Sequence, residues 1–172
     1  MAVATPPTGV SNGELIRWSF AALNDHDAEA MGAAQSETIV ERFPEVTLHG
    51  RGEVAAYFRT LFAALPDVRL EIQALVEQGD EVFVRWHLTG THTGAPFQGI
   101  APSGRSVAID GVDHLVVRDG QIASNFVVYD QMQFARQIGL LPADGTPGDR
   151  AAKAAFNART RLLERLRNRR RR

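Results

Sequence analysis

The hydrophobic and polar positions along the chain follow two periods, which predict helices in the first third and mainly strands after it. From Ser11 onward, apolar residues recur every three or four positions, as in an amphipathic helix that ends near Asn24. A short second helix through Met31 is expected to follow. A stripe of the same spacing over residues 52–65 predicts another helix, which Pro66 terminates.

Alternation of apolar and polar residues then predicts a series of strands. The strands are expected at residues 37–43, 68–73, 81–89, 106–118 and 121–130. Asp119-Gly120 joins the last two and is typical of a two-residue hairpin turn. A short helix over residues 131–138 follows. This order of elements predicts an α+β fold, in which helices cover one face of a curved sheet and leave a pocket between them.

A length of 172 residues, 44% of them hydrophobic, suits one globular domain. We expect a disordered leader, one domain, and a segment of linker, helix and arginine-rich tail, at residues 1–10, 11–142 and 143–172. Residues 1–150 hold 10 Arg and 19 acidic residues, a net charge of −9. Residues 151–172 hold 9 Lys and Arg and one acid, a net charge of +8. An acidic domain disfavours a nucleic-acid partner, except through the tail.

Residues that are missing exclude or disfavour several kinds of chemistry. The chain has no cysteine, which excludes disulfides and thiolate catalysis. It has no apolar run of about 20 residues and no apolar leader, so we expect a cytoplasmic protein without a membrane partner. The 5 histidines lack metal-binding spacing, and no nucleotide-binding glycine motif occurs. Neither a metal nor a cofactor is therefore expected.

Asp130 is the first candidate for a catalytic group. It ends the last expected strand on the face of Ile122, Phe126 and Val128, and an aspartate in apolar surroundings has a raised pKa that suits a general acid or base. The alternative is that Asp130 caps the helix that starts at Gln131, which would stabilise the charged carboxylate. An exposed Asp130 at a helix start would favour a binding domain over an enzyme.

The register of the last hairpin supplies a second candidate. A two-residue turn pairs Asp113 with Phe126 and puts Asp113 on the face of Asp130, whereas His114 lies on the opposite face. A bulge would exchange them, because a shift of one residue inverts both faces. One of Asp113 and His114 is therefore expected to line the pocket as a catalytic partner. The alternative is that each is a structural polar group.

Basic and aromatic residues are candidates for binding a substrate. Arg85 could orient a carboxylate or an enolate oxygen, although an exposed arginine on a strand fits the pattern as well. The aromatic candidates can belong either to the pocket wall or to the core. They are Trp18, Tyr57, Trp86, Phe97 and Phe126.

Short motifs occur in a characteristic order along residues 49–142. They are His49-Gly50, Leu65-Pro66-Asp67, Gly79-Asp80-Glu81-Val82, Arg85-Trp86, Gly90-Thr91-His92-Thr93-Gly94, Phe97-Gln98-Gly99-Ile100, Pro102-Ser103-Gly104-Arg105, Arg118-Asp119-Gly120-Gln121-Ile122, and Asp130 with Gln137-Ile138-Gly139-Leu140. In this order and spacing, the segment resembles the SnoaL-like polyketide cyclases of the NTF2-like superfamily.

This resemblance implies an NTF2-like cone, in which a curved mixed or antiparallel sheet and N-terminal helices enclose an apolar pocket, and a homodimer packed through the sheet. It also implies ring closure of an aromatic polyketide by intramolecular aldol condensation without cofactor or metal, with the aspartate matching Asp130 as the acid/base. The chain departs from the family at Val128, where a polar residue or histidine is frequent. It departs again at Ser124 and Phe126, where Glu and Trp are common, so the reaction can differ.

Three functions fit these residues. The first is a cyclase or isomerase in which Asp130 removes a proton next to a carbonyl of an apolar polyketide-like substrate. In that reaction Asp113, His114 or Arg85 would stabilise the enolate oxygen. The second is a non-catalytic domain that binds a small molecule or mediates dimerisation. The third, epoxide hydrolysis, needs two carboxylates bridged by an arginine, for which Asp113, Asp130 and Arg85 supply the residue types.

Overall fold

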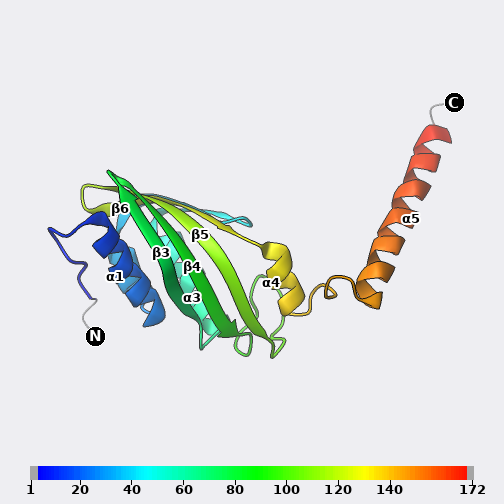
Figure 1. Cartoon of the computed structure of the whole chain (residues 1–172), viewed down its shortest axis with the longest axis horizontal. Helices are drawn as coiled ribbons and strands as arrows, with labels where there is room; N and C mark the ends of the chain where they lie inside the picture. Colours follow the sequence, from blue (N-terminus) through cyan, green and yellow to red (C-terminus); the bar gives the residue numbers. More distant parts are fainter. Residues whose placement is uncertain (1–3, 170–172) are drawn as a thin grey trace.

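The chain folds into one curved, mixed sheet whose inner face is covered by helices (Figure 1). The computed structural model describes residues 4–169. Its strands cross the sheet in the order β2-β1-β6-β5-β4-β3, and β1 runs parallel to β6 while the other neighbouring pairs are antiparallel. The strands are β1 (Gln35–Arg42), β2 (Thr47–His49), β3 (Arg69–Gln78), β4 (Glu81–Thr91), β5 (Ser106–Arg118) and β6 (Gln121–Tyr129).

Three helices cover the inner face of the sheet, and two follow the last strand. Helices α1, α2 and α3 pack against β1, β3 and β4, as expected for an α+β fold. Helix α4 lies beside β5, and α5 extends away from the sheet (Figure 1). The helices are α1 (Asn12–Asn24), α2 (Ala28–Ala33), α3 (Gly50–Ala64), α4 (Gln131–Gln137) and α5 (Pro147–Arg169).

Local sequence signals explain how the first helix begins. Ser11 accepts a hydrogen bond from the backbone N–H of Glu14, and the Glu14 side chain accepts one from the backbone N–H of Ser11. This reciprocal pair satisfies two donors that a helix start leaves free. The buried face of α1 then packs its apolar residues, including Ile16 and Phe20, on the inner side of the sheet.

The sheet faces follow the alternation of the strands. In β4, the alternating apolar residues Val82, Val84, Trp86 and Leu88 are buried, as expected for a strand with one face on the core. The outer face is largely exposed and keeps several apolar side chains in solvent, among them Phe83 on the same strand. The homodimer expected from the family resemblance stays a prediction.

Some element boundaries differ from the expected ones. Strand β2 was not expected, because three residues are too short to show an alternation. Strand β3 continues to Gln78 instead of ending at Gln73, where a register shift between Ile72 and Ala74 breaks the alternation. Such bulges bend strands and increase their twist, which helps to curve the sheet.

The two ends of the chain lie outside the sheet and its covering helices. Residues 4–10 form no helix or strand. The helix expected within residues 143–172 begins at Pro147, where the Thr146 hydroxyl accepts a hydrogen bond from the backbone N–H of Asp149 at 3.3 Å. Residues 1–3 of the expected leader and 170–172 of the expected arginine-rich tail fall outside the described residues. Within residues 4–169, no helix combines the length and apolar composition needed to cross a membrane.

Candidate active site

A cavity lies between the inner face of the sheet and the covering helices, and its lining is mostly aliphatic and aromatic. Helices α1, α2 and α3 and strands β1, β3, β4, β5 and β6 all contribute to it. The polar exceptions among the lining residues, apart from tyrosine and tryptophan, are Ser19, Gln35, Glu41, Asp113 and Asn125. Burial of a carboxyl group in such surroundings disfavours its charged form and raises its pKa, and contacts with neighbouring polar groups modify that shift.

A bulge in β6 decides which residues of the last hairpin face the cavity. Val117 pairs with Ile122 as the two-residue turn predicts, but Val116 pairs with Ser124, so Ala123 is an extra residue. From there on, every side chain of β6 points to the face opposite to the expected one. Asn125 is thereby turned inward, and Asp113, which pairs with Val127, stays on the inner face of β5.

Asp113 lies at the polar centre of the cavity. Its side chain is 7% exposed. Oδ1 accepts a hydrogen bond of 2.8 Å from Nε1 of Trp86, and Oδ2 accepts one of 3.2 Å from Nδ2 of Asn125. Burial raises the pKa of the Asp113 carboxyl to about 6, although both hydrogen bonds act to lower it.

Glu41 is the second buried carboxyl group of the cavity. It reaches the cavity from β1 and is 4% exposed. Its Oε1 accepts a hydrogen bond of 2.9 Å from Nδ2 of Asn125. Burial, and then the negative charge of Asp113, raise the pKa of Glu41 to about 8. Its Oε2 is buried and has no hydrogen-bond partner among the described residues.

Asn125 joins these two carboxyl groups. Its amide nitrogen donates one hydrogen bond to Glu41 and one to Asp113. The two carboxyl groups are therefore close neighbours on either side of this nitrogen. Two negative charges this close in apolar surroundings repel strongly, which favours a state in which one of the two carboxyl groups is protonated. Near pH 7 the pKa values favour a charged Asp113 and a protonated Glu41. The cavity therefore holds a base and an acid side by side.

A third carboxylate, Glu45, holds together the aromatic end of the cavity. Its Oε1 accepts hydrogen bonds from the Tyr57 hydroxyl at 2.8 Å and from Nε2 of Gln98 at 2.9 Å. Its Oε2 accepts from the Tyr129 hydroxyl at 2.8 Å and from Nε2 of Gln131 at 3.0 Å. Burial, and then the charge of Glu45, hold the pKa of both tyrosine hydroxyls above their usual range. The tyrosines therefore stay neutral, and Glu45 joins α3, β6 and α4 to the loop between β4 and β5.

Three of the aromatic residues proposed for substrate binding line the cavity. Trp86 contacts Asp113, and Tyr57 and Phe97 form part of the aromatic end, with their ring centroids 6.0 Å apart. The other two are placed elsewhere. Trp18 packs against the core outside the cavity lining, and Phe126 is exposed on the outer face, where the guanidinium carbon of Arg42 lies 5.2 Å from its ring centroid.

The prediction that Arg85 contributes to the pocket is wrong. Arg85 is exposed on the outer face of β4, because its neighbours Val84 and Trp86 point inward. Among the described residues that line the cavity there is no arginine. The bridge between the two carboxyl groups is the amide of Asn125, so the arrangement expected for epoxide hydrolysis is not present in this part of the chain.

His114 also lies outside the cavity. It is on the outer face of β5, where its ring stacks on Phe83 with the centroids 4.3 Å apart. Its Nε2 is 3.6 Å from Oε2 of Glu81 on the same face. Of the two neighbours proposed as alternatives, the structure therefore places Asp113 in the cavity and His114 outside it.

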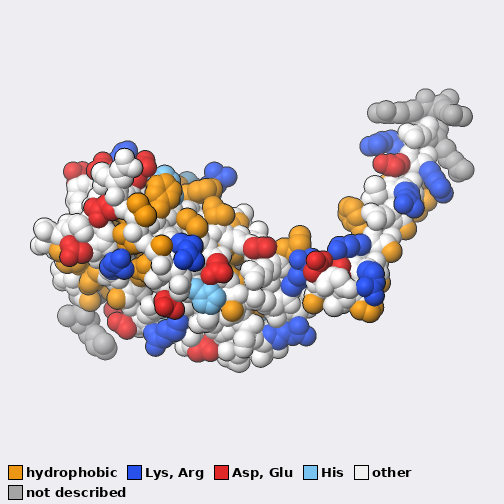
Figure 2. All heavy atoms as spheres, viewed as in Figure 1, with side chains coloured by type: hydrophobic (Ala, Val, Ile, Leu, Met, Phe, Trp, Pro, Cys, Tyr) orange, Lys and Arg blue, Asp and Glu red, His pale blue; other side chains and the backbone are white. Residues whose placement is uncertain are grey.

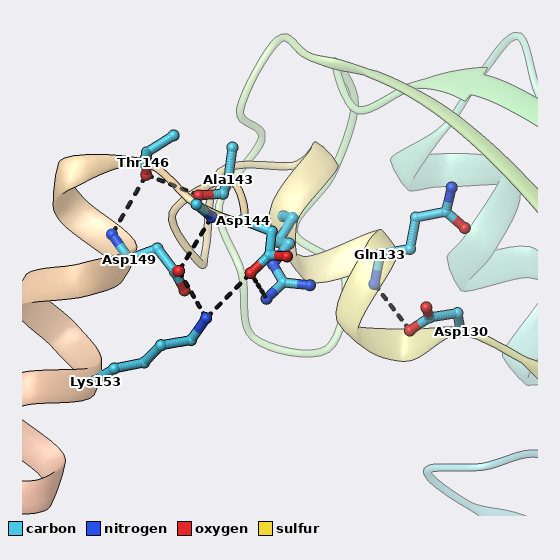
Figure 3. A network of polar contacts seen from close by, with 9 residues as sticks. Asp130, Gln133, Ala143, Asp144, Thr146, Asp149 and Lys153 are labelled. Atoms are coloured by element: carbon cyan, nitrogen blue, oxygen red, sulfur yellow. Dashed lines mark hydrogen bonds and ion pairs between the residues drawn. The ribbon is translucent and has the colours of Figure 1, made fainter.

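The prediction that Asp130 lies in apolar surroundings is wrong. Asp130 lies at the start of α4 (Figure 3). It is exposed there and is not among the residues that line the cavity. Its Oδ1 accepts hydrogen bonds from the backbone N–H groups of Met132 and Gln133 at 2.9 and 3.0 Å. This is the helix-capping alternative. The bulge at Ala123 is the cause, because it turns the face of Asp130 away from the cavity.

Sequence reasoning missed Glu41, Asn125 and Gln35. The pattern of β1 offered a signal for Glu41, because it lies two positions from Ile39 and two from Phe43, which places it on the face of these apolar residues. Asn125 could be found only by anticipating the bulge, since an unbroken hairpin turns it outward. Within residues 4–169, no group of three or more His, Asp or Glu side chains is arranged to hold a metal ion.

Comparisons with known proteins agree with this architecture. TsrD from Streptomyces laurentii superposes with a TM-score of 0.67 at 25% identity, over 73% of this chain and 92% of TsrD. IdmH from Streptomyces antibioticus gives 0.61 at 25% identity, over 72% and 95% of the two chains. An NTF2-like protein of unknown function from Burkholderia pseudomallei K96243 gives 0.65 at 22% identity, over 76% and 99%.

None of the curated proteins compared with this chain matches it. The solved structures establish the NTF2-like fold, which confirms the expected cone of curved sheet and N-terminal helices. A family model described as SnoaL-like polyketide cyclase matches residues 14–138, which include β1 to β6 and every polar residue of the cavity. The chain therefore belongs to the SnoaL-like polyketide cyclase family.

Proposed function

We propose that this protein catalyses cofactor-free proton transfer next to a carbonyl group of an apolar, polyketide-like substrate. The observation that carries the proposal is the pair of buried carboxyl groups, Glu41 and Asp113, bridged by one amide in an otherwise apolar cavity. The family match supports the same class of chemistry. The acid/base role moves from the exposed Asp130 to Asp113.

In the proposed reaction, Asp113 acts as the base. Its carboxylate accepts a proton from the carbon next to the carbonyl, and the electron pair of the broken C–H bond moves into the enolate. Hydrogen bonds from Trp86 and Asn125 hold the carboxylate in place. Because both oxygens accept hydrogen bonds, the Asp113 side chain cannot rotate freely, and its orientation toward the substrate is maintained.

Glu41 supplies the matching acid. In its protonated form it donates a hydrogen bond to the substrate carbonyl oxygen, and it stabilises the enolate as negative charge develops there. Its Oε2 is the atom that has no protein partner among the described residues. The enolate carbon then attacks a second carbonyl of the same molecule and closes a ring, and the new alkoxide oxygen takes the proton held by Asp113. Alternatively, the enolate regains that proton at another carbon and shifts a double bond.

The aromatic end of the cavity favours a flat, apolar substrate. Tyr57, Phe97, Tyr129 and Phe134 line this end, and the tyrosine hydroxyls are occupied by Glu45. Their rings therefore present apolar faces toward a ligand. Aromatic rings stack with other flat ring systems at about 0.5–1.5 kcal/mol beyond the burial of area.

The test is a hydrogen-exchange reaction that needs no knowledge of the natural substrate. 2-Tetralone is an apolar bicyclic ketone, and its exchange of α-hydrogens in D2O is followed by proton NMR. We expect the wild type to accelerate this exchange above the buffer rate, with a maximum between pH 6 and 8 that reflects the pKa values of Asp113 and Glu41. Asp113→Asn should reduce the acceleration by about a hundredfold or more.

Asp130→Asn is the matched control, since it makes the same change of side chain at an exposed position. It should leave the exchange rate as in the wild type. Loss of exchange in Asp130→Asn with retention in Asp113→Asn would overturn the assignment of the base. A folded wild type that leaves the buffer rate unchanged over this pH range would overturn the proposed proton transfer for this ketone class.

A second candidate function is binding without catalysis, and the exposed capping position of Asp130 favours it. In that case the cavity holds an apolar ligand and the carboxyl pair only orients it. Saturation-transfer NMR with 2-tetralone separates the two functions. Binding by wild type and Asp113→Asn alike, together with no exchange in either, is the outcome expected for a binding domain.

A further inference from the structure

Helix α5 extends away from the sheet and exposes its side chains to solvent (Figures 1 and 2). Residues 151–168 are all exposed, and no described element packs extensively against them. Among the described contacts, ion pairs hold only the N-terminal end of the helix. Lys153 contacts Asp149 at 2.7 Å and Asp144 at 3.1 Å (Figure 3). Arg136 of α4 also contacts Asp144, at 3.4 Å. Most of the helix is therefore available to a partner.

Large apolar side chains occupy one side of this exposed helix. Phe156, Leu162, Leu163 and Leu166 are 64, 56, 51 and 48% exposed, respectively. At about 100° per residue, the seven-residue step from Phe156 to Leu163 and the four-residue step from Leu162 to Leu166 keep these side chains on one side. Four large apolar residues on a solvent-exposed helix are costly unless a partner covers them.

The opposite side of α5 is polar and carries arginines together with one acid, Glu164. Arg161 and Arg165 are four residues apart and share a face, on the side away from the leucines. Residues 151–172 carry a net charge of +8. A second copy of the same helix would be repelled by this charge. The positive charge therefore favours an anionic partner. The apolar side favours a partner that also offers an apolar environment in which Phe and Leu side chains can be buried.

We propose that α5 binds the surface of a membrane that contains anionic lipids. A helix with a basic side, an apolar side of Phe and Leu and low overall hydrophobicity lies in the plane of the lipid headgroups, with its apolar side toward the acyl chains. Arg159 falls within the apolar side, and its long aliphatic stem lets the guanidinium reach the headgroups. The expectation of no membrane partner rested on the lack of a spanning segment, which a surface helix does not need.

Other anionic partners fit α5 less well. A nucleic acid would neutralise the arginines but leave Phe156 and the leucines in water. The acidic body of the protein carries a net charge of −9 over residues 1–150, yet the described structure shows α5 standing away from it. Both alternatives have distinct outcomes in the test below.

The test measures co-sedimentation of the full chain with lipid vesicles. We expect binding to vesicles with about one third phosphatidylglycerol and little binding to pure phosphatidylcholine, because the arginines need anionic headgroups. Phe156→Ser with Leu163→Ser should lower the partition coefficient by about tenfold or more. Arg161→Gln with Arg165→Gln should lower it on anionic vesicles and weaken its dependence on salt.

The matched control is Asn157→Ser with Asn168→Ser, which places two serines on the polar side of α5 and should leave binding unchanged. Because the substituted side chains of α5 are exposed, these variants should not disturb the folding of the sheet. Circular dichroism measures whether the helix content is retained. Equal binding to neutral and anionic vesicles, or none to either, would overturn the proposal. So would vesicle binding that survives both double variants. Binding to duplex DNA, or dimers that depend on α5, in the absence of vesicle binding would assign the helix to those partners instead.

Discussion

Glu41 and Asp113 accept hydrogen bonds from the same atom, Nδ2 of Asn125, at 2.9 and 3.2 Å. The contact joins β1, β5 and β6 inside the cavity, and Glu41 and Asn125 are 84 positions apart along the chain. One neutral amide thus holds two acids whose pKa values burial raises, to about 8 for Glu41 and about 6 for Asp113. Stability and activity should both respond to this arrangement.

The stability of the fold should fall as the pH rises from about 4.5 to about 8. Over this range the folded protein holds a proton on Glu41 that the unfolded chain, with an ordinary pKa of 4.5, has already lost. Asp113 adds to the effect between 3.8 and about 6. Each group contributes a slope of at most about 1.4 kcal/mol per pH unit within its own window, and nothing below or above it.

Urea denaturation at a series of pH values measures this slope. Glu41→Gln keeps the shape of the side chain and cannot ionise, so it should flatten the decrease between pH 6 and 8. Glu71→Gln, an exposed position on β3, is the control and should keep the wild-type slope. A wild-type stability that does not change between pH 4.5 and 8 would contradict the buried, neutral state of Glu41.

Asp130→Ala should lower the free energy of unfolding by about 1 kcal/mol, because it removes the acceptor for two backbone N–H groups at the start of α4. Asparagine caps helices as well as aspartate does, so Asp130→Asn should retain the stability. Denaturant melts of both variants make the comparison. If the alanine variant were as stable as the wild type, Asp130 would have no capping role.

Gly111→Ala should displace Trp86 and so disturb the hydrogen bonding of Asp113, the proposed base. A Cβ at Gly111 would lie 2.1 Å from the ring of Trp86, so the indole must move. The hydrogen bond from Nε1 of Trp86 to Asp113 would then be weakened or lost. We expect a loss of about 1–3 kcal/mol in stability from the overpacking and a lower rate of 2-tetralone exchange.

Fluorescence of the remaining tryptophan in a Trp18→Phe background reports the displacement of Trp86, since the chain has 2 tryptophans. Gly52→Ala is the matched control, because a Cβ there meets no atom within 4 Å. An unchanged emission spectrum and exchange rate in Gly111→Ala would show that the close approach of Trp86 does not matter.

Glu45→Gln should loosen the aromatic end of the cavity. Each carboxylate oxygen of Glu45 accepts two hydrogen bonds. In glutamine an NH2 group replaces one of these oxygens and cannot accept, so at least one donor loses its acceptor. We expect a loss of about 1–3 kcal/mol in stability. Backbone amides of residues 95–100 should also exchange faster, because Gln98 is one of the contacts that fasten this loop.

Hydrogen-exchange mass spectrometry of the loop peptide measures this change. Glu53→Gln serves as a comparison on α3, since Glu53 contacts only the start of its own helix. Unchanged exchange of residues 95–100 in Glu45→Gln would mean that Gln98 does not hold the loop, and that the packing of Phe97 and the backbone hydrogen bond from Ala95 to Ala63 suffice.

Most of the fold was predictable because helices and strands follow local periodicity. The helix from Ser11, the inward residues of β4 and the strand of residues 106–118 all agree with the pattern. These elements bury one face each, and a buried face leaves a clear alternation in the chain. The α+β architecture with a cavity under a curved sheet follows from their order.

The tertiary structure decided the chemistry of the cavity. Phe126, Val127, Val128 and Tyr129 are all apolar, so no alternation reveals which face of β6 is buried, and the bulge at Ala123 inverts the expected one. This single extra residue turns Asp130 outward and Asn125 inward. Glu41 meets Asn125 from a distant strand, through pairing between β1 and β6 that no local pattern encodes. Register depends on packing across the whole sheet, and an acid/base pair built from three strands depends on register.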